Sequence, residues 1–255
     1  MARKKIEKIL VIPDQHFNIN CKRAWKLLLL VAKTFKPDIV IILGDMLDLK
    51  GVSKYSKDPQ TTARVNSEIQ RGKKALDELA QHCNPKRKVF IEGNHEERLN
   101  TYKNDRAGAI SDLIDPIDKL LNLKEKGWEF VRYKRSIRIG KCRYSHFFGH
   151  HGETALKKAM EDNQGLSAVF GHTHRLASIS KRSNDGRVAQ VVTCGWGGNH
   201  KHTDYKHQIK TKDYVQGCVL GYMFNNGTVQ FSTVPFQRGS CVIEGKLVTL
   251  NGGKK

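Results

Sequence analysis

Short apolar runs alternate along the chain with longer segments whose apolar residues recur at helical spacing. Strands are predicted at four of the apolar runs: residues 9–12, 39–43, 89–91 and 168–170. Helices are predicted between the first three runs. Residues 22–35 form an apolar segment too long for a strand, and residues 61–83 carry apolar positions at amphipathic spacing. This alternation predicts an α/β fold.

The second half of the chain is richer in strand patterns. Residues 98 to about 123 are predicted to be helical, with a break near Pro116, as a cap inserted over the functional site. The later elements are predicted as a β-hairpin over 130–146, a short helix over 153–162, strands over 188–193, 214–224 and 228–234, and a further strand pair within 238–255. No repeat or linker interrupts the pattern. We therefore expect a single domain over residues 1–255, with its core at about 6–235 and C-terminal strands and tail at 236–255.

The composition argues against a membrane-spanning, disulfide-stabilised or thiol-liganded protein. No segment reaches the roughly 20 apolar residues of a transmembrane helix. The basic N-terminus has no apolar region of the signal-peptide type, and the six cysteines are scattered without close pairs. We therefore expect free thiols and a reducing, cytoplasmic location.

The chain is strongly basic. It has 45 Lys and Arg against 25 Asp and Glu, a formal charge of +20. Such an excess suggests a polyanionic partner such as DNA or RNA, and a solvated basic surface is the alternative. The cations cluster at residues 3–5, 86–88, 132–143 and 201–212. The second and third clusters lie at a strand entrance or along the predicted hairpin, so their relation to a functional site stays open.

Five short polar motifs follow the apolar runs in order along the chain. They are Asp14-Gln15-His16, Gly44-Asp45-Met46-Leu47-Asp48, Gly93-Asn94-His95-Glu96, a histidine cluster at His146, His150 and His151, and Gly171-His172-Thr173-His174. Polar groups that repeatedly follow buried strands are how an open α/β sheet builds an active site. Oxygen and imidazole donors with almost no thiol suit two adjacent divalent cations. The motifs therefore indicate a binuclear metal hydrolase.

Phosphate ester hydrolysis explains why these residue types would be combined. Two cations about 3.5–4 Å apart can share one hydroxide, lower its pKa and neutralise phosphoryl oxygens. Such a pair needs a carboxylate able to bridge, several neutral imidazoles and an open position on each metal. The glycines before Asp45, Asn94 and His172 would allow sharp turns with positive φ. An asparagine oxygen adds no charge to a site that must accept phosphate.

In this order and with these gaps, the five motifs resemble those of the calcineurin-like metallophosphoesterase superfamily. The resemblance covers residues 6 to 235. The amino-acid sequences at 93–99 and 171–176 are similar to those of small phosphoesterases from bacteriophages and bacteria. It implies a four-layer α/β/β/α sandwich with mixed sheets and flanking helices. It also implies phosphate ester hydrolysis by a metal-bridged hydroxide in a bacterial or phage-infected host cytoplasm. The two divalent ions would be manganese first, with iron, zinc, nickel or magnesium as alternatives.

The resemblance further implies roles for individual residues. One metal would be held by Asp14, His16, Asp45 and His174, and the other by the bridging Asp45 with Asn94, a histidine of the fourth motif and His172. His95 would face the substrate as a cationic acid or phosphate-stabilising group, oriented by Asp48. Glu96 and Glu97 are interpreted as acids that begin a helix. Arg98 would contact phosphate or form a salt bridge on the helix face.

The histidine ligand of the fourth motif is open between two positions. Many members of the family have a His-Gly dipeptide at this motif, which favours His151 as the ligand. Strand geometry instead selects His146, which follows the predicted strand at 142–145, and we favour it. His150 or His151 would then line the substrate pocket.

Three functions remain compatible with the sequence. The favoured one is a phosphodiesterase or nuclease acting on nucleic acid or nucleotides. The alternatives are a phosphomonoesterase on a small molecule or protein, and a basic nucleic-acid-binding protein with a vestigial metal site. The complete donor set argues against the last, and the motif at 44–48 lacks the Arg-Gly that follows it in protein phosphatases. Trp196, in a glycine-rich loop, is expected to pack rather than to stack a base. No membrane partner is expected, and the oligomeric state is open.

Overall fold

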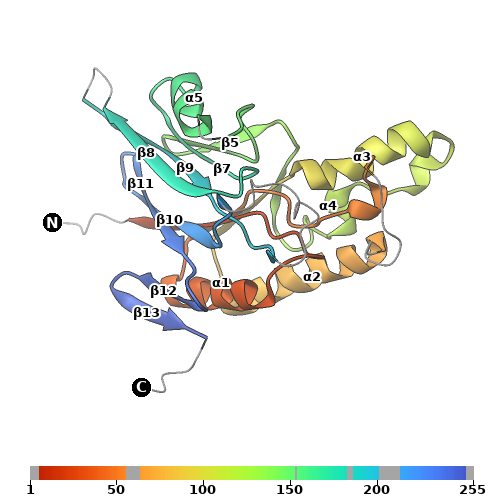
Figure 1. Ribbon diagram of the computed structural model, residues 1–255, viewed down its shortest axis with the longest axis horizontal. Helices are drawn as coiled ribbons and strands as arrows, with labels where there is room; N and C mark the ends of the chain where they lie inside the picture. Colours follow the sequence, from red (N-terminus) through yellow and green to blue (C-terminus); the bar gives the residue numbers. More distant parts are fainter. Residues whose placement is uncertain (1–5, 56–63, 153, 183–185, 201–212, 251–255) are drawn as a thin grey trace.

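Two mixed β-sheets packed face to face form the centre of the fold (Figure 1). The structure, a computed structural model, describes residues 6–55, 64–152, 154–182, 186–200 and 213–250. The basic clusters predicted at 3–5 and 201–212 lie outside these residues, as do the predicted helix starts at Thr61 and Glu153 and the end of the tail.

The first sheet has six strands in the order β11-β10-β1-β2-β3-β4. They are β1 (Glu7–Ile12), β2 (Ile39–Ile42), β3 (Arg87–Ile91), β4 (Glu129–Val131), β10 (Gly217–Met223) and β11 (Val229–Pro235). β1 to β4 run parallel, so their carboxyl ends share one edge, and β10 and β11 extend the sheet antiparallel beyond β1. Three of the predicted apolar runs therefore form the middle of this sheet.

The second sheet has five strands in the order β5-β6-β7-β9-β8. They are β5 (Ser136–Ile139), β6 (Cys142–Ser145), β7 (Ser167–Phe170), β8 (Leu176–Arg182) and β9 (Val188–Cys194). β6, β7 and β9 are parallel, and antiparallel β5 and β8 form the edges. Ile9 and Val11 of β1 pack in one fully buried cluster with Tyr144 of β6 and Val192 of β9, which joins the two sheets.

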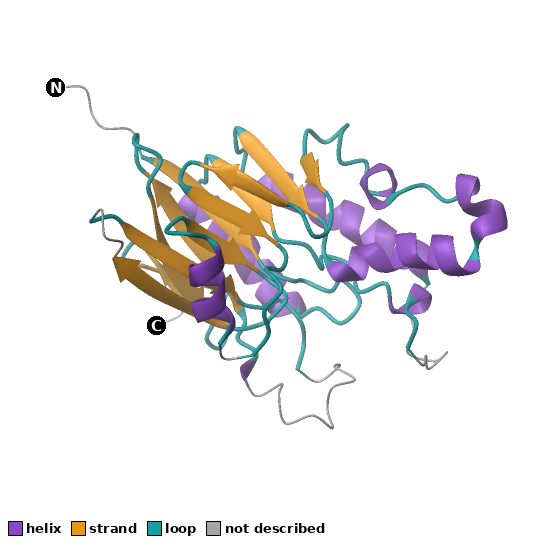
Figure 2. Ribbon diagram, turned by 90° about the horizontal axis from the view of Figure 1, so that it is seen from above, coloured by secondary structure: helices purple, strands orange, loops and turns teal. Residues whose placement is uncertain are grey.

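Helices cover the outer faces of both sheets (Figure 2). α1 (Lys22–Phe35) and α2 (Val65–His82) pack on the six-stranded sheet. They contact Leu10 and Ile12, which point away from the second sheet because strand side chains alternate. α5 (Ala155–Asp162) covers the five-stranded sheet. The predicted four-layer α/β/β/α sandwich is confirmed.

A helical segment follows β3 and extends beyond the sheets (Figure 1). It comprises α3 (Asn94–Arg106), the 3-10 helix η2 (Gly108–Leu113) and α4 (Ile117–Leu120). The helix begins at Asn94, earlier than the predicted start at Arg98, because the Glu96 carboxylate accepts the Gly93 N–H (3.0 Å) and caps the first turn. No helix in the described part of the chain combines the length and apolar character needed to cross a membrane.

Two regions differ from the predicted strands. β4 pairs in parallel with β3, so the predicted hairpin is limited to β5 and β6. β8 has no counterpart among the predictions, because its outer end is polar and exposed. The strand pair predicted in the tail is present as β12 (Ser240–Ile243) and β13 (Lys246–Thr249), which pack beside α1.

Candidate metal centre

The predicted ligands meet where the carboxyl ends of the two sheets face each other. The loops after β1 and β2 carry Asp14, His16 and Asp45, and Asn94 is the first residue of α3, just after β3. The loops after β6 and β7 carry His146, His172 and His174. Each donor follows a buried strand end, so sheet geometry brings together residues that are distant in sequence.

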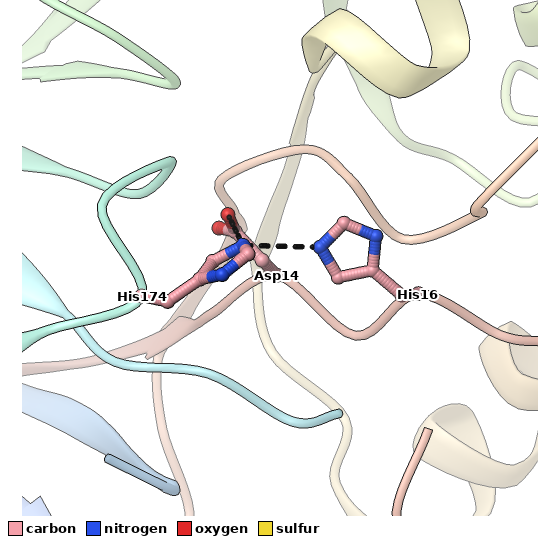
Figure 3. A group of neighbouring side chains, drawn as sticks. All are labelled: Asp14, His16 and His174. Carbon is pink, nitrogen blue, oxygen red and sulfur yellow. Dashed lines mark hydrogen bonds and ion pairs between the residues drawn. The ribbon is translucent and has the colours of Figure 1, made fainter. Parts of the chain in front are cut away.

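The first cluster contains Asp14, His16 and His174, whose side chains point toward one another (Figure 3). The His16 and His174 Nε2 atoms are 3.2 Å apart, and His174 Nε2 is 3.3 Å from Asp14 Oδ2. Ligand atoms that share one ion at about 2.1 Å lie about 3.0–3.4 Å from each other. The second oxygen of Asp14 is buried without a hydrogen-bond partner in the described structure. These donors fit a divalent cation.

The second cluster contains Asp45, Asn94, His146 and His172. Asn94 Oδ1 is 2.9 Å from His146 Nε2 and 2.7 Å from His172 Nδ1. His146 Nε2 is in turn 3.5 Å from Asp45 Oδ2. This set of one carboxylate, one amide oxygen and two imidazoles has the spacing of donors around a second cation.

Asp45 adjoins both clusters. A carboxylate oxygen of Asp45 lies within 4.8 Å of donor atoms of His16 and His95. A carboxylate oxygen of Asp45 also lies within 4.8 Å of donor atoms of His146 and His172. Its Oδ1 also accepts the backbone N–H of His95 at 2.8 Å. A carboxylate so placed has the position that a bridging ligand between two cations requires.

The backbone at the centre is unusual for non-glycine residues. His16, Asp45, His172 and His174 all have φ between 47° and 62°. This left-handed region costs free energy and is found at functional sites where surrounding contacts enforce it. The shared conformation indicates that these side chains are aimed by their turns rather than by strand alternation.

The glycines of the motifs serve two different purposes. The predicted positive φ is present at Gly44 (94°). It is absent at Gly93, where φ is −93°, and at Gly171. At these two positions a Cβ would come within 2.2 Å of Asp45 Oδ1 and 2.3 Å of Asp14 Oδ1 respectively. The prediction is therefore wrong for Gly93 and Gly171, which provide room for the carboxylates.

The protonation states at the centre match those of metal ligands. Burial opposes ionisation of Asp14 and Asp45, but the surrounding histidines outweigh it and hold the pKa of both carboxyls below its usual range. Burial and the neighbouring imidazoles lower the pKa of His16, and they lower the pKa of His172 to about 4. Ionised carboxylates and neutral imidazoles are the forms that bind cations.

Two buried glutamates support the loop between Gly44 and Leu49. Glu96 accepts the backbone N–H groups of Asp45 and Leu47, each at 2.8 Å, in addition to that of Gly93. Glu68, on α2, accepts those of Asp48 and Leu49 at 3.0 and 2.7 Å. Both side chains are fully buried.

The sequence interpretation missed these glutamates. It interpreted Glu96 only as an acid that begins a helix, which is its place in α3, and it did not single out Glu68. The spacing of Glu96 three residues after Gly93 is a capping-box signal that could have indicated its bond to the Gly93 N–H. No comparable signal marks Glu68, because only the packing of α2 brings it to the loop.

His95 lies beside the clusters with both ring nitrogens engaged. Its Nδ1 is 2.9 Å from the carbonyl oxygen of Asp48 and 3.1 Å from the Asp48 carboxylate. Its Nε2 is 2.9 Å from Nη2 of Arg98, which also donates to the Asp48 carbonyl. Burial lowers the pKa of His95, but Asp45 and Asp48 outweigh this and raise it.

The three histidines of the fourth motif lie in different surroundings. His146 is buried in the second cluster, with Nδ1 2.8 Å from the Leu43 carbonyl. His151 is exposed at the cleft, where its ring lies 5.1 Å from that of His172. His150 instead pairs with the exposed Asp162 at 2.5 Å, away from the donors. This placement favours His146 as the ligand, and the ligand assignment itself stays a prediction.

A cleft of about 830 Å³ opens over both clusters, large enough for a small organic substrate. Its lining includes four predicted ligands, three cations and two tyrosines: Asp45, Asn94, His172 and His174; Lys54, Arg98 and Arg175; Tyr55 and Tyr214. Only the first part of α3, up to Thr101, lines it, so the predicted cap covers one wall.

Trp196 is 1% exposed and stacks on His174, which confirms the expected packing role.

Sequence comparisons match most of the chain. A family model described as calcineurin-like phosphoesterase matches residues 7–176. The chain is 23% identical over 238 residues to the Gene 54 protein of Mycobacterium phage L5, covering 85% of this chain and 86% of that protein. It is 21% identical over 243 residues to the Gene 54 protein of Mycobacterium phage D29, covering 87% and 88%.

Two solved structures are also similar. Vacuolar Protein Sorting 29 from Cryptosporidium parvum matches with a TM-score of 0.47 and 13% identity, over 95% of this chain and 94% of that chain. A phosphatase from Mycoplasma pneumoniae matches with a TM-score of 0.38 and 11% identity, over 91% and 94%. Since the family model covers well over half of the sequence, the chain belongs to the calcineurin-like phosphoesterase family and is a metal-dependent phosphoester hydrolase.

Proposed function

We propose that the protein is a phosphodiesterase or nuclease that hydrolyses nucleic acid or nucleotides with two divalent metal ions. The observation that carries this proposal is the pair of donor clusters that adjoin Asp45 at the floor of a large cleft. Lys54 and Arg98, which line the cleft, add attraction for a phosphate chain, whereas Arg175 is paired with Asp213 at 2.8 Å.

The donor residues would divide between the two ions as their contacts suggest. Asp14, His16, Asp45 and His174 would hold one ion, and Asp45, Asn94, His146 and His172 the other. When bound, the two ions supply a water of lowered pKa and Lewis acidity toward the phosphoryl oxygens. Carboxylate, amide and imidazole donors are compatible with manganese, which the family resemblance places first, and with iron, zinc, nickel and magnesium as alternatives.

His95 would donate a proton to the leaving-group oxygen. Asp48 holds its Nδ1 side, which leaves Nε2 directed toward Arg98 and the cleft. A phosphate bound in the cleft would compete with His95 for the Arg98 guanidinium, because charge-assisted bonds to phosphate are stronger than bonds to a neutral ring. Arg98 would then stabilise the phosphoryl charge, and Nε2 would be free to act as an acid.

The shape of the cleft supports a diester. A diester carries a substituent on each side of phosphorus, so it needs space beyond the metal pair on both sides. The walls come from several parts of the chain: the loop at 52–55, the start of α3, residues 151–152, the β7–β8 loop with Arg175, and the segment before β10 with Tyr214. A phosphate monoester of a small group would leave much of this space empty.

The proposal is tested with matched aryl substrates and a single-stranded oligonucleotide. Purified protein, stripped by chelator and reloaded with manganese, is expected to hydrolyse bis(4-nitrophenyl) phosphate faster than 4-nitrophenyl phosphate and to cleave the oligonucleotide. His150→Ala, which removes a histidine outside the clusters, serves as the control and should behave as the unaltered protein. Faster monoester hydrolysis would establish the phosphomonoesterase. Nucleic-acid binding without hydrolysis under any of the five metals would establish the non-catalytic alternative.

A further inference from the structure

The basic clusters predicted at 86–88 and 132–143 begin at opposite edges of the six-stranded sheet, and the second continues along β5 and β6. Residues 86–88 are at the amino end of β3, away from the donors. Residues 132–135 follow the carboxyl end of β4, at the same sheet edge as the metal centre. We call residues 132–135, which connect β4 to β5, the β4–β5 loop.

The cations of the first cluster are engaged by neighbouring groups. Lys86 Nζ lies 3.2 Å from Oδ1 of Asp38. Arg87 forms a bidentate ion pair with the Glu129 carboxylate, at 2.7 and 2.8 Å. Lys88 donates to the carbonyl oxygen of Lys126. Their charges therefore serve the fold.

The cations of the β4–β5 loop are differently placed. Arg132, Lys134 and Arg135 are all exposed. Within the described chain, they form none of the ion pairs that engage Lys86 and Arg87. The Glu92 carboxylate interacts with Arg132, and Lys134 Nζ lies 5.8 Å from the centroid of the Tyr133 ring. Three cations within four residues nevertheless create a local positive potential at this surface.

Three contacts hold the loop beside the metal centre. The Tyr133 ring lies 6.1 Å from that of His146, and its N–H donates to the buried Glu92 carboxylate at 3.1 Å. The carbonyl oxygen of Arg135 accepts from the hydroxyl of Ser145, the residue before His146, at 3.0 Å. The three cations therefore stand on a loop fixed beside a predicted metal ligand.

We propose that the β4–β5 loop binds the backbone phosphates of a polynucleotide and guides the chain into the metal centre. This inference rests on the proposed phosphodiesterase function and assigns the polyanion to one surface among the basic regions. Contacts to phosphate position a nucleic acid without reading its sequence, so cleavage should be sequence-independent. Each contact also releases counterions, which makes binding depend on salt.

The experiment measures kcat/KM for single-stranded DNA cleavage over a potassium chloride series with excess manganese. The test variant combines Arg132→Gln, Lys134→Gln and Arg135→Gln. The control variant combines Lys26→Gln, Lys33→Gln and Lys74→Gln, which removes the same charge from exposed positions of α1 and α2. Thermal melting and bound manganese are compared first, to verify that each variant is folded and metal-loaded.

The unaltered protein and the control should share a steep fall of kcat/KM with salt. The test variant should have a log–log slope shallower by about 2, since each single-strand contact contributes about 0.7. Lys134 has a φ of 62°, so a second variant with only Arg132→Gln and Arg135→Gln avoids a change at that strained position. Its slope should differ from that of the unaltered protein by about two thirds of the change expected for the test variant.

The outcomes separate the inference from the function on which it rests. Equal slopes for the test and control variants would overturn the role of the loop while leaving the phosphodiesterase intact. Hydrolysis of bis(4-nitrophenyl) phosphate without cleavage of DNA or RNA would likewise overturn the loop's role and keep the diesterase. Hydrolysis of neither substrate by the metal-loaded protein would overturn both.

Discussion

The two sheets contribute unequal halves to the metal centre. The carboxylate side, from the six-stranded sheet, comprises Asp14, His16, Asp45 and Asn94; the histidine side, from the five-stranded sheet, comprises His146, His172 and His174. The carboxylate side has internal support, because Glu96 and Glu68 bind the backbone of its central loop.

The histidine side depends on its partner. His146 contacts the Leu43 carbonyl oxygen, and the backbone N–H of His172 donates to Asp14 at 2.9 Å. His174 also contacts Asp14 through its ring. The difference shows that negative charge is fixed in one sheet, and that the three imidazoles of the histidine side are placed by docking of the second sheet against it. Asp45, on the carboxylate side, adjoins both clusters, so its loss should affect both ions, whereas loss of a ligand on the histidine side should affect one.

Asp45→Ala is expected to have the largest effect, because it removes the carboxylate that adjoins both clusters. Metal content by elemental analysis should fall for both ions. The rate of aryl diester hydrolysis should fall by more than roughly 10²–10⁴-fold, which is the usual contribution of a general acid. Asp162→Ala, which removes an exposed carboxylate, is the control. Near-normal turnover and metal content in Asp45→Ala would contradict a shared ligand.

His95→Ala separates chemistry from metal binding on the carboxylate side. Both ions should remain, while turnover falls about 10²–10⁴-fold. The loss should shrink for strongly acidic leaving groups, which need little protonation. Because an acid must be protonated, turnover of the unaltered protein should fall as pH rises through the raised pKa of His95. That alkaline limb should be missing from the variant.

Uniform loss across leaving groups would point to a different role for His95. The ring would then hold the phosphate rather than transfer a proton. Metal content measured beside each rate distinguishes either role from simple loss of a ligand.

His146→Ala tests the histidine side against its two neighbours. One ion should be lost, with an affinity drop of at least the roughly 10–100-fold caused by removing an outer-shell partner. His151→Ala should keep both ions and raise KM, since this side chain lines the cleft. His150→Ala should change neither quantity. Loss of an ion in His151→Ala, with full occupancy in His146→Ala, would reverse the assignment.

Glu68→Gln probes the support of the carboxylate side and should have the smallest effect. Burial, more than any other influence, raises the pKa of Glu68 from 4.5 to about 7. The folded state therefore holds a proton that the unfolded state releases between these values, and its stability falls as pH rises across this window. The variant still accepts the two N–H groups but has no proton to lose.

Denaturant unfolding of the metal-free protein between pH 5 and pH 8 measures this difference. Relative to the unaltered protein, Glu68→Gln should gain about 1–3 kcal/mol across the series. Asp77→Asn, an exposed acid on the same helix, should show no such trend. A constant difference at all pH values would mean that Glu68 is ionised throughout.

Much of the fold could be predicted because its central strands are locally distinctive. β1, β2, β3 and β7 are buried almost throughout and appear as apolar runs. β8 could not be recognised in this way. It is an edge strand with polar residues at its outer end, and its pairing with β9 is what makes it a strand. For the same reason, the sequence did not show that β4 joins β3 rather than the hairpin.

The buried glutamates mark another limit of prediction. Glu68 has the spacing of an ordinary helix acid, and the capping spacing of Glu96 indicates only its bond to Gly93, not those to Asp45 and Leu47. Their burial follows from the way α2 and α3 pack against the loop that carries Asp45. A carboxylate bound to backbone N–H groups and one exposed to solvent look the same in a sequence.

By itself, the sequence determined which donors are present and that each follows a strand end, because residue chemistry and apolar runs are local properties. The tertiary structure decided which donors meet. His16 and His174, separated by 158 positions, come within 3.2 Å because the two sheets align their carboxyl ends. It also decided that His146 lies among the donors with His151 outside, and that one basic cluster lies beside the centre and the other at the opposite end of the strands. Strand order and sheet docking set these relations, and both depend on contacts between distant residues.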